Sequence, residues 1–397
     1  MIHLSKALVV LTFISMFWLP KSNFVSLTGL RPEDIVGFFC VIFLPVYFAN
    51  TYRKISSKFI LSLLLYFLYI LSISLIRSFE YTPYILVLYL KELSYLSTFF
   101  IFFYTFNKIN LEKIKNFSFL LLAIIVPPIF YGLYQIITFN FTGIYGLALY
   151  GHEQSPASNG LLFLFIFIFL NIASRSIIQS QIKPIYIFIS GIIVLLTGSK
   201  IAVLGMFAFV LSSFLLNSKF KEKLFGVFSL SLGLFFIFYL MSTNIGALSR
   251  YSGFLNPVAT IQGRGIWWKV KWVDGIVGNI TGMGLGAGHI NDGKFNMTMA
   301  MDNLYLYWYV VLGFFGTILF IATLWSLYRA FPQKKMEKLF FLSILISYLS
   351  MGMGAEIFQL SISGLLFWSM SGTLLALAKT DNWTKMTILN EKNIIKQ

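Results

Sequence analysis

The feature that most constrains this chain is a succession of long apolar runs separated by mostly short connections. A membrane-spanning helix needs about 20 mostly apolar residues, because the hydrocarbon core of a bilayer is about 30 Å thick. Charged residues make up 11% of the chain, against about 25% in an ordinary soluble protein. We therefore expect an all-α polytopic membrane protein in which residues 1–397 form a single membrane domain.

Twelve apolar runs qualify as spans, and because several are short the sequence is compatible with eleven to thirteen. The predicted spans are Ile2–Pro20, Asp34–Ala49, Phe59–Ile76, Tyr84–Phe106, Phe117–Phe139, Ser158–Ala173, Pro184–Thr197, Ile201–Leu216, Leu224–Met241, Asn303–Phe331, Leu339–Gly352 and Ile357–Ala378.

The basic residues indicate how the chain is oriented. On a soluble protein a net charge of +16 would suggest nucleic-acid binding, but here the bases lie between the spans. With the N-terminus inside, the inner connections and tail hold 20 Lys and Arg, and the outer connections hold nine. Short cytoplasmic loops carry such an excess, so we expect both termini in the cytoplasm and no nucleic-acid partner. The lone cysteine, Cys40, excludes an internal disulfide and cysteine–zinc chemistry.

One connection differs from the others. Residues Ser242–Asp302 form a link of about sixty residues on the expected outer side, and loops of that length are usually functional or disordered. Apolar residues at helical spacing within Gly265–Gly278, together with three tryptophans, predict a short amphipathic helix on the outer membrane face. Arg264 and Lys271 share one stripe of that helix. An aromatic membrane anchor and a substrate-binding element are both compatible with this pattern.

Glycine recurs at every second position from Gly282 to Gly288, directly before His289. A nucleotide-binding fingerprint would need a preceding strand, and none is predicted there. Two interpretations remain for the run: an irregular backbone whose N–H groups approach an anion, or a flexible turn.

Several ionisable residues fall near the expected outer membrane face. Lys91 and Glu92 lie inside the fourth span, Lys200 in a tight hairpin, Glu153 in an outer link, and Glu356 at the start of the last span. A charge within a span costs about 2.5–3.5 kcal/mol on insertion scales and tends to be kept for function. Each residue taken singly is more often a satisfied polar group. Together with the long loop, they suggest an outward-facing site for an anionic, lipid-linked substrate.

At this point the chain resembles a known family. The residues that carry the resemblance are, in order, Thr197-Gly198-Ser199-Lys200, Arg264 with Trp267, Gly284-Leu285-Gly286-Ala287-Gly288, Asp302-Asn303-Leu304-Tyr305-Leu306 and Gly313-Phe314-Phe315-Gly316. This order is similar to the signature of the O-antigen polymerase and O-antigen ligase superfamily. The resemblance implies a glycosyltransferase C-like architecture with one large periplasmic loop, in the bacterial inner membrane. Many relatives have Arg in place of Lys200 and a His–Asn pair in place of Asp302-Asn303, and the missing histidine favours polymerase over ligase.

The resemblance also implies a reaction: transfer of a glycan from undecaprenyl diphosphate to another lipid-linked repeat at the periplasmic face. Cations would hold the diphosphate, and a carboxylate or histidine would take the acceptor proton. The candidates for the first role are Lys91, Lys200, Arg264 and Lys271, and those for the second are Glu153, His289 and Asp302.

No cluster has metal-ligand spacing, so we expect a metal-independent enzyme without a cofactor. Its expected partners are membrane lipids and a chain-length regulator and flippase of the same pathway. The alternatives are an O-antigen ligase, a lipid-linked oligosaccharide flippase or another transporter, although the chain lacks the internal repeats usual in transporters.

Overall fold

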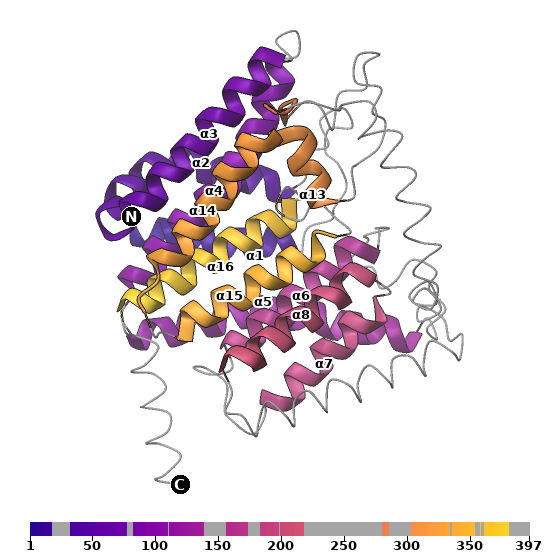
Figure 1. The fold of residues 1–397 in the computed structure, drawn as a ribbon. Coiled ribbons are helices and arrows are strands. Elements are labelled where there is room, and N and C mark those ends of the chain that lie inside the picture. Colours follow the sequence, from indigo (N-terminus) through magenta and orange to yellow (C-terminus); the bar gives the residue numbers. More distant parts are fainter. Residues whose placement is uncertain are drawn as a thin grey trace, which may run out of the picture.

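The computed structural model describes residues 1–17, 32–77, 82–109, 111–138, 156–173, 183–197, 199–217, 280–285, 303–333, 336–353, 358 and 361–380. Within these ranges every regular element is a helix, which confirms the all-α prediction (Figure 1). The elements are α1 (Ile2–Phe17), α2 (Pro32–Thr51), η1 (Tyr52–Lys54), α3 (Ser57–Arg77), α4 (Thr82–Lys108), α5 (Leu111–Thr138), α6 (Pro156–Ala173), α7 (Lys183–Leu196), α8 (Lys200–Asn217), α13 (Leu304–Tyr307), η6 (Trp308–Leu312), α14 (Gly313–Ala330), α15 (Met336–Met351) and α16 (Ser361–Thr380).

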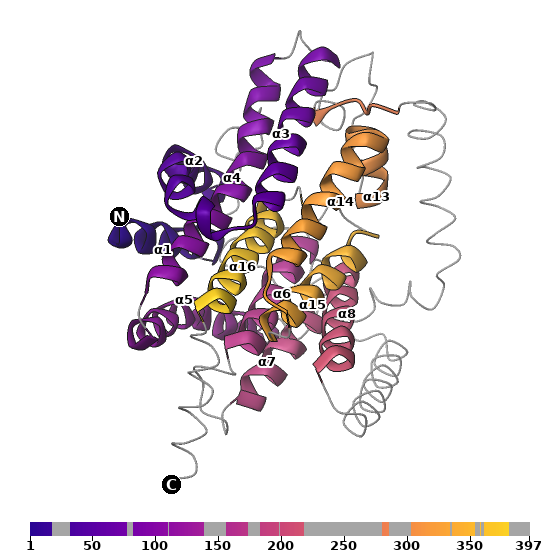
Figure 2. The same cartoon turned by 60° about the vertical axis from the view of Figure 1, so that its left-hand side comes forward.

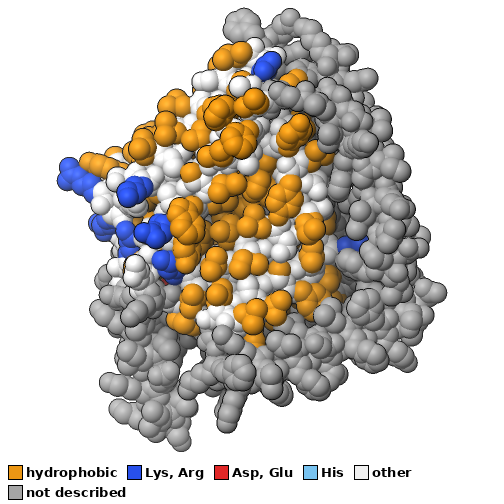
Figure 3. Space-filling view, in the orientation of Figure 1, with side chains coloured by type: hydrophobic (Ala, Val, Ile, Leu, Met, Phe, Trp, Pro, Cys, Tyr) orange, Lys and Arg blue, Asp and Glu red, His pale blue; other side chains and the backbone are white. Residues whose placement is uncertain are grey.

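Each predicted span contains a helix, apart from Leu224–Met241, which lies outside the described residues. Four described stretches are long and apolar enough to cross a membrane: Asp34–Lys54, Ser57–Arg77, Ile85–Lys108 and Leu304–Ala330. Figure 3 shows that one face of the molecule is covered by hydrophobic side chains. A surface of this kind suits contact with lipid rather than water.

The helices pack around α4 and α16, which make the most extensive contact of any described pair. A Cβ atom added at Gly372 would collide with the backbone carbonyl of Phe99, so glycine allows the two backbones to approach closely. On one side α2 packs against α4, and α14 packs against α3 (Figure 2). On the other side, α15 joins α16 to α8 and its neighbours α6 and α7.

Buried hydroxyl groups within the helices donate to their own backbones. Thr12 donates to the Leu8 carbonyl at 2.7 Å, and Thr105 donates to the Ile101 carbonyl at 2.7 Å. A hydroxyl bonded in this way carries no unsatisfied donor into an apolar interior. These residues are therefore satisfied within their own helices and imply no polar site.

The predicted span Asn303–Phe331 has the expected length, but it is not one continuous helix. Residues 308–312 form a π-helical turn, and Gly313 then adopts φ 64° and ψ −170°, which is far from helical values. In Figure 1 the orange ribbon turns sharply between α14 and α13. The predicted span is therefore long and apolar enough to cross a membrane, as expected, and the break within it is the most irregular part of the described fold.

Candidate functional site

The helix break leaves backbone groups that an uninterrupted helix would have paired with each other. In a regular α-helix the Phe314 N–H would donate to the Val310 carbonyl four residues earlier. Here the Phe314 N–H donates to the Ile280 carbonyl at 2.9 Å, and the Val310 carbonyl accepts the Met283 N–H at 2.8 Å. The Val311 carbonyl accepts the Gly284 N–H at 3.0 Å. We call residues 280–285 the clasp. The clasp forms hydrogen bonds with backbone carbonyls before the break and with a backbone N–H after it.

Glycine is required at three points of this junction. Gly282, Gly284 and Gly313 all have positive φ angles, of 80°, 81° and 64°. A Cβ atom at Gly282 would collide with the Val311 carbonyl, and one at Gly284 would lie 2.5 Å from the Ser74 Cα atom. The alternation of glycine in this part of the sequence therefore reflects close backbone contact.

The sequence left two interpretations of the glycine run, an anion-binding backbone or a flexible turn, and the structure of the clasp fits neither. The N–H groups of Met283 and Gly284 donate to carbonyls of η6, and the N–H of Leu285 donates to the Ser74 hydroxyl at 2.9 Å. Because these donors are engaged within the protein, they do not form an anion-binding nest, and the segment is not a free turn. Gly286, Gly288 and His289 lie outside the described residues.

Helix α3 holds the clasp from the other side. The Tyr69 hydroxyl donates to the Thr281 carbonyl at 2.5 Å, and the Arg77 guanidinium donates to the Thr281 hydroxyl at 3.0 Å. The Ser74 hydroxyl accepts from Leu285 and itself donates to the Ile70 carbonyl at 2.5 Å. Sequence reasoning missed all three anchors, because a Ser, a Tyr and a terminal Arg in an apolar helix carry no signal of a distant partner.

The chain is also anchored at Asn303, on the far side of residues 286–302. The Asn303 side chain caps α13 by accepting the Leu306 N–H at 3.0 Å. The Leu304 N–H donates to the Gly352 carbonyl at 2.8 Å, and the Tyr305 hydroxyl donates to the Leu349 carbonyl at 2.8 Å. Of the two described ends that flank residues 286–302, the clasp is therefore bonded to the broken helix, and the Asn303 end begins that helix and is bonded to the C-terminal end of α15.

An aromatic groove lies beside the break, with a cavity volume of about 420 Å³. It is lined by Ile280, Tyr305, Trp308, Tyr309, Gly313, Phe314 and Thr317. The rim is open, because Phe314 is 62% exposed and Ile280 is 60% exposed. A concave surface of this composition can hold an apolar chain, with the clasp forming part of its wall.

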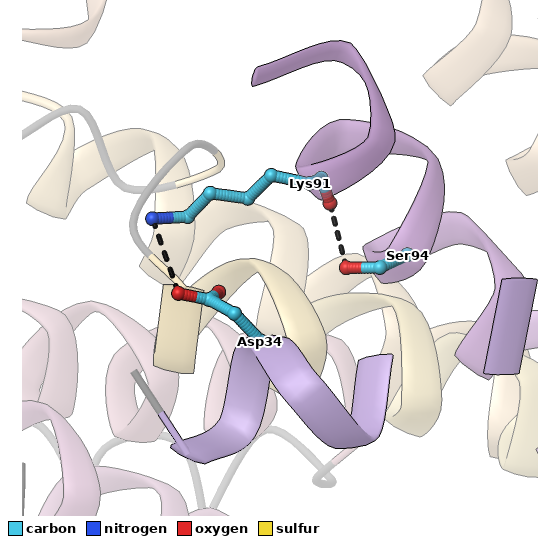
Figure 4. A network of polar contacts seen from close by, with 3 residues as sticks. All are labelled: Asp34, Lys91 and Ser94. Carbon is cyan, nitrogen blue, oxygen red and sulfur yellow. Dashed lines mark hydrogen bonds and ion pairs between the residues drawn. The ribbon is translucent and has the colours of Figure 1, made fainter. Parts of the chain in front are cut away.

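Lys91 is the first of the two predicted substrate-binding residues that the structure describes. Its ammonium lies 3.5 Å from the Asp34 carboxylate, which is fully buried at the start of α2 (Figure 4). The Ser94 hydroxyl donates to the Lys91 carbonyl at 2.7 Å, and Ser94 packs directly against Gly37 of α2. The Lys91 charge therefore has a carboxylate partner within the bundle, and the pair ties α2 to α4.

Lys200, the second, is the first residue of α8 and is partly exposed. The preceding residues of its motif act as helix caps: Thr197 donates to the Val194 carbonyl at 2.7 Å, and the Ser199 hydroxyl accepts the Ala202 N–H at 3.3 Å. These caps determine where α8 begins and so set the position of Lys200. Lys91 and Lys200 belong to different helix pairs, since α4 packs with α2 and α16 whereas α8 packs with α15 and α6.

The remaining predicted site residues lie outside the described residues. They are Glu153, Arg264, Lys271, His289 and Asp302. In sequence, Asp302 directly precedes Asn303, the capping residue of α13. The predicted amphipathic helix at Gly265–Gly278 is likewise outside the described residues.

In its described part the molecule is an all-helical bundle with helices long enough to cross a membrane, one of which is broken and clasped beside an aromatic groove. No protein-family model and no curated protein matches the chain.

Proposed function

We infer that this chain is a membrane glycosyltransferase of the polysaccharide polymerase type, which transfers a glycan from undecaprenyl diphosphate to another lipid-linked repeat unit at the periplasmic membrane face. The observation that carries this proposal is the aromatic groove at the broken helix. A polyprenyl donor needs an apolar surface for its tail close to polar groups for its diphosphate. The groove supplies the apolar surface, and its wall, Ile280, leads back in sequence to Lys271 and Arg264.

The broken helix supports a substrate-binding site at this position on physical grounds. Irregular backbone is tolerated at membrane depth only where protein or a cavity surrounds it, and the broken helices of secondary transporters build binding sites in this way. Here the clasp forms hydrogen bonds with the backbone groups exposed by the break. The clasp is itself part of the long connection whose sequence carries Arg264, His289 and Asp302. The chemistry would then be divided between a tail-binding groove and a loop that holds the diphosphate and the proton acceptor.

Arg264 is the residue through which the proposal is most directly tested. A guanidinium presents a planar fork that matches a phosphate, whereas a lysine ammonium acts as a point charge. We expect Arg264→Ala to abolish polymerisation and Arg264→Lys to recover little activity, because stabilisation of a leaving diphosphate needs geometry as well as charge. A membrane anchor would tolerate lysine, since one basic residue near an anionic membrane contributes about 1 kcal/mol whatever its shape.

The experiment is to delete the gene in its host, complement it with wild type, Arg264→Ala or Arg264→Lys, and separate the surface polysaccharide on a gel. Loss of a polymerase leaves a single repeat on the anchor. Unattached lipid-linked polymer would instead indicate a ligase, and repeats trapped inside the cell would indicate a flippase. Polymer of normal length and amount with Arg264→Lys would make Arg264 a membrane anchor and remove the proposed role.

A further inference from the structure

Five exposed cations gather at the opposite end of α3 from the clasp, where three helix ends meet. We call this group the basic junction: Arg53, Lys54, Lys58, Lys108 and Lys379. The Lys54 ammonium donates to the Asn107 side-chain carbonyl at 2.6 Å, which joins η1 to the last turn of α4. The Lys379 ammonium donates to the Lys54 backbone carbonyl, which brings in the end of α16. Figure 3 shows Lys and Arg side chains gathered at the left edge, near the left ends of α3 and α16 in Figure 1.

The charge of the junction is not neutralised within the described structure. None of the five cations forms an ion pair with another residue in the described ranges. Glu337 at the start of α15 is 2% exposed and therefore buried away from the surface, and Glu112, four residues after Lys108, has a side chain outside the described set. Like charges held together by the fold repel one another, and a bound anion would relieve that repulsion.

An apolar stripe begins one turn beyond the junction. Leu61, Leu64, Leu65 and Leu68 of α3 occur at helical spacing, and they are between 46% and 59% exposed. They share one face of the helix that begins beside Lys58. Tyr52, 41% exposed, directly precedes Arg53 in η1, and an amphipathic ring of this kind favours headgroup depth.

We propose that the basic junction is a binding site for an anionic phospholipid, with the headgroup phosphate among the five cations and the acyl chains along the leucine stripe of α3. Arg53 is suited to bind the phosphate. Its Nε atom donates to the Tyr52 hydroxyl at 2.9 Å, and this contact holds the guanidinium in place while the two terminal nitrogens remain the atoms that form a bidentate pair with phosphate. The adjoining apolar stripe favours a lipid over a free phosphate, because only a lipid uses both surfaces.

The test uses the purified full chain in detergent, titrated with dioleoylphosphatidylglycerol or dioleoylphosphatidylcholine and followed by native mass spectrometry. The site variant is Arg53→Gln with Lys58→Gln, which leaves the helix-joining contacts of Lys54 and Lys379 intact. The matched control is Lys6→Gln with Lys338→Gln. It removes the same charge from cations that lie over the rings of Phe117 and Tyr328.

We expect wild type to prefer phosphatidylglycerol, the site variant to bind it at least about tenfold more weakly, and the control to retain it. Inorganic phosphate at the same concentration should not displace the lipid.

An equal loss of binding in the control would mean that diffuse surface charge attracts the lipid. Displacement by inorganic phosphate would mean an anion site in which the leucines have no role. Either result overturns the proposal. If the double site variant folds poorly, Lys58→Gln alone should still weaken binding about threefold, and unchanged binding would count against the site.

Discussion

Single charged and polar residues in this bundle are held by specific partners. Asp34 is fully buried, and Lys91 is 21% exposed, so the ion pair between them is partly shielded from water. A pair of this kind contributes little beyond an apolar alternative, yet loss of one member is costly because the other charge stays buried. Its structural role can therefore be separated from a role in binding substrate.

We expect Lys91→Met to lower the stability of the purified protein by about 3 kcal/mol, since it removes the ammonium from beside the buried Asp34 carboxylate. The double variant Asp34→Asn with Lys91→Met should recover most of this loss. Thermal unfolding in detergent and the polysaccharide gel are the two measurements. If the double variant is stable and still makes polymer, Lys91 only joins helices; if it is stable but inactive, Lys91 contacts the diphosphate as the family resemblance implies.

The proton acceptor is a second question at the scale of single residues. Glu153→Gln and Asp302→Asn keep the shape of each side chain but remove its basicity, so the acceptor's variant should lose chain extension at a normal protein level. Gel analysis of the surface polysaccharide from each complemented strain is the readout. Full activity in both would leave His289 as the remaining candidate, and full activity in His289→Ala as well would exclude all three.

At the scale of elements, the clasp and the broken helix form one unit. Three hydrogen bonds between clasp and helix replace those that a continuous helix would have made, and Tyr69, Ser74 and Arg77 attach the unit to α3. A change at the break should therefore disturb both the clasp and the groove.

Gly313→Ala tests this coupling. Its backbone conformation is nearly exclusive to glycine, which makes a substitution cost about 1–3 kcal/mol, and the added Cβ would also collide with the Gly282 N atom. We expect a lower unfolding temperature and loss of polymer. Gly191→Ala is the matched control, because a Cβ there would lie 3.5 Å from the Phe167 ring, an ordinary contact. If Gly313→Ala and Gly191→Ala had the same unfolding temperature and made the same amount of polymer, the backbone conformation of the break would not be needed for stability or activity.

Two adjacent phenylalanines differ in whether they line the groove. Phe314, 62% exposed, lines the groove, whereas Phe315, 52% exposed, is not among its lining residues. If the groove holds the donor's tail, Phe314→Ala should raise the KM for an undecaprenyl donor about fivefold, from about 1 kcal/mol of lost apolar contact. A short-chain donor should be unaffected, and Phe315→Ala should resemble wild type. Equal effects of both variants would place the tail elsewhere.

At the scale of the whole molecule, the clasp and the basic junction lie at opposite ends of α3. If α3 crosses the bilayer, these two surfaces face opposite aqueous phases. The charge count in the sequence predicts that the junction is cytoplasmic and that residues 242–302 are periplasmic.

This orientation is testable by cysteine labelling. Cys40 is 1% exposed, and a Cys40→Ser background removes any remaining reaction from it. Cysteines placed at Ser252 and Asn291 should then react with a membrane-impermeant thiol reagent in whole cells, and one placed at Ser57, beside the junction, should react only after lysis. The reverse pattern would invert the predicted topology.

The length of the apolar runs was sufficient to predict the long described helices. Inside a bilayer each span must form its own backbone hydrogen bonds. The need for a continuous apolar helix is therefore local, and it can be recognised from consecutive residues. The hairpin predicted at Thr197–Lys200 coincides with the start of α8, where the Ser199 cap acts over three residues. The expected role of Lys200 in holding the substrate diphosphate remains a prediction of the resemblance.

The clasp, the break and the Asp34–Lys91 pair were decided only by tertiary structure. Leu285 is bonded to Ser74 across 211 residues of sequence, and Tyr69 reaches Thr281 across 212. Gly313 stands in a motif of the family resemblance, but nothing in the sequence shows that the helix breaks there, because the clasp that bonds to the broken backbone lies about thirty residues earlier. Contacts of this kind depend on how helices meet in space, and a single sequence contains no periodicity that encodes which distant backbone groups will meet.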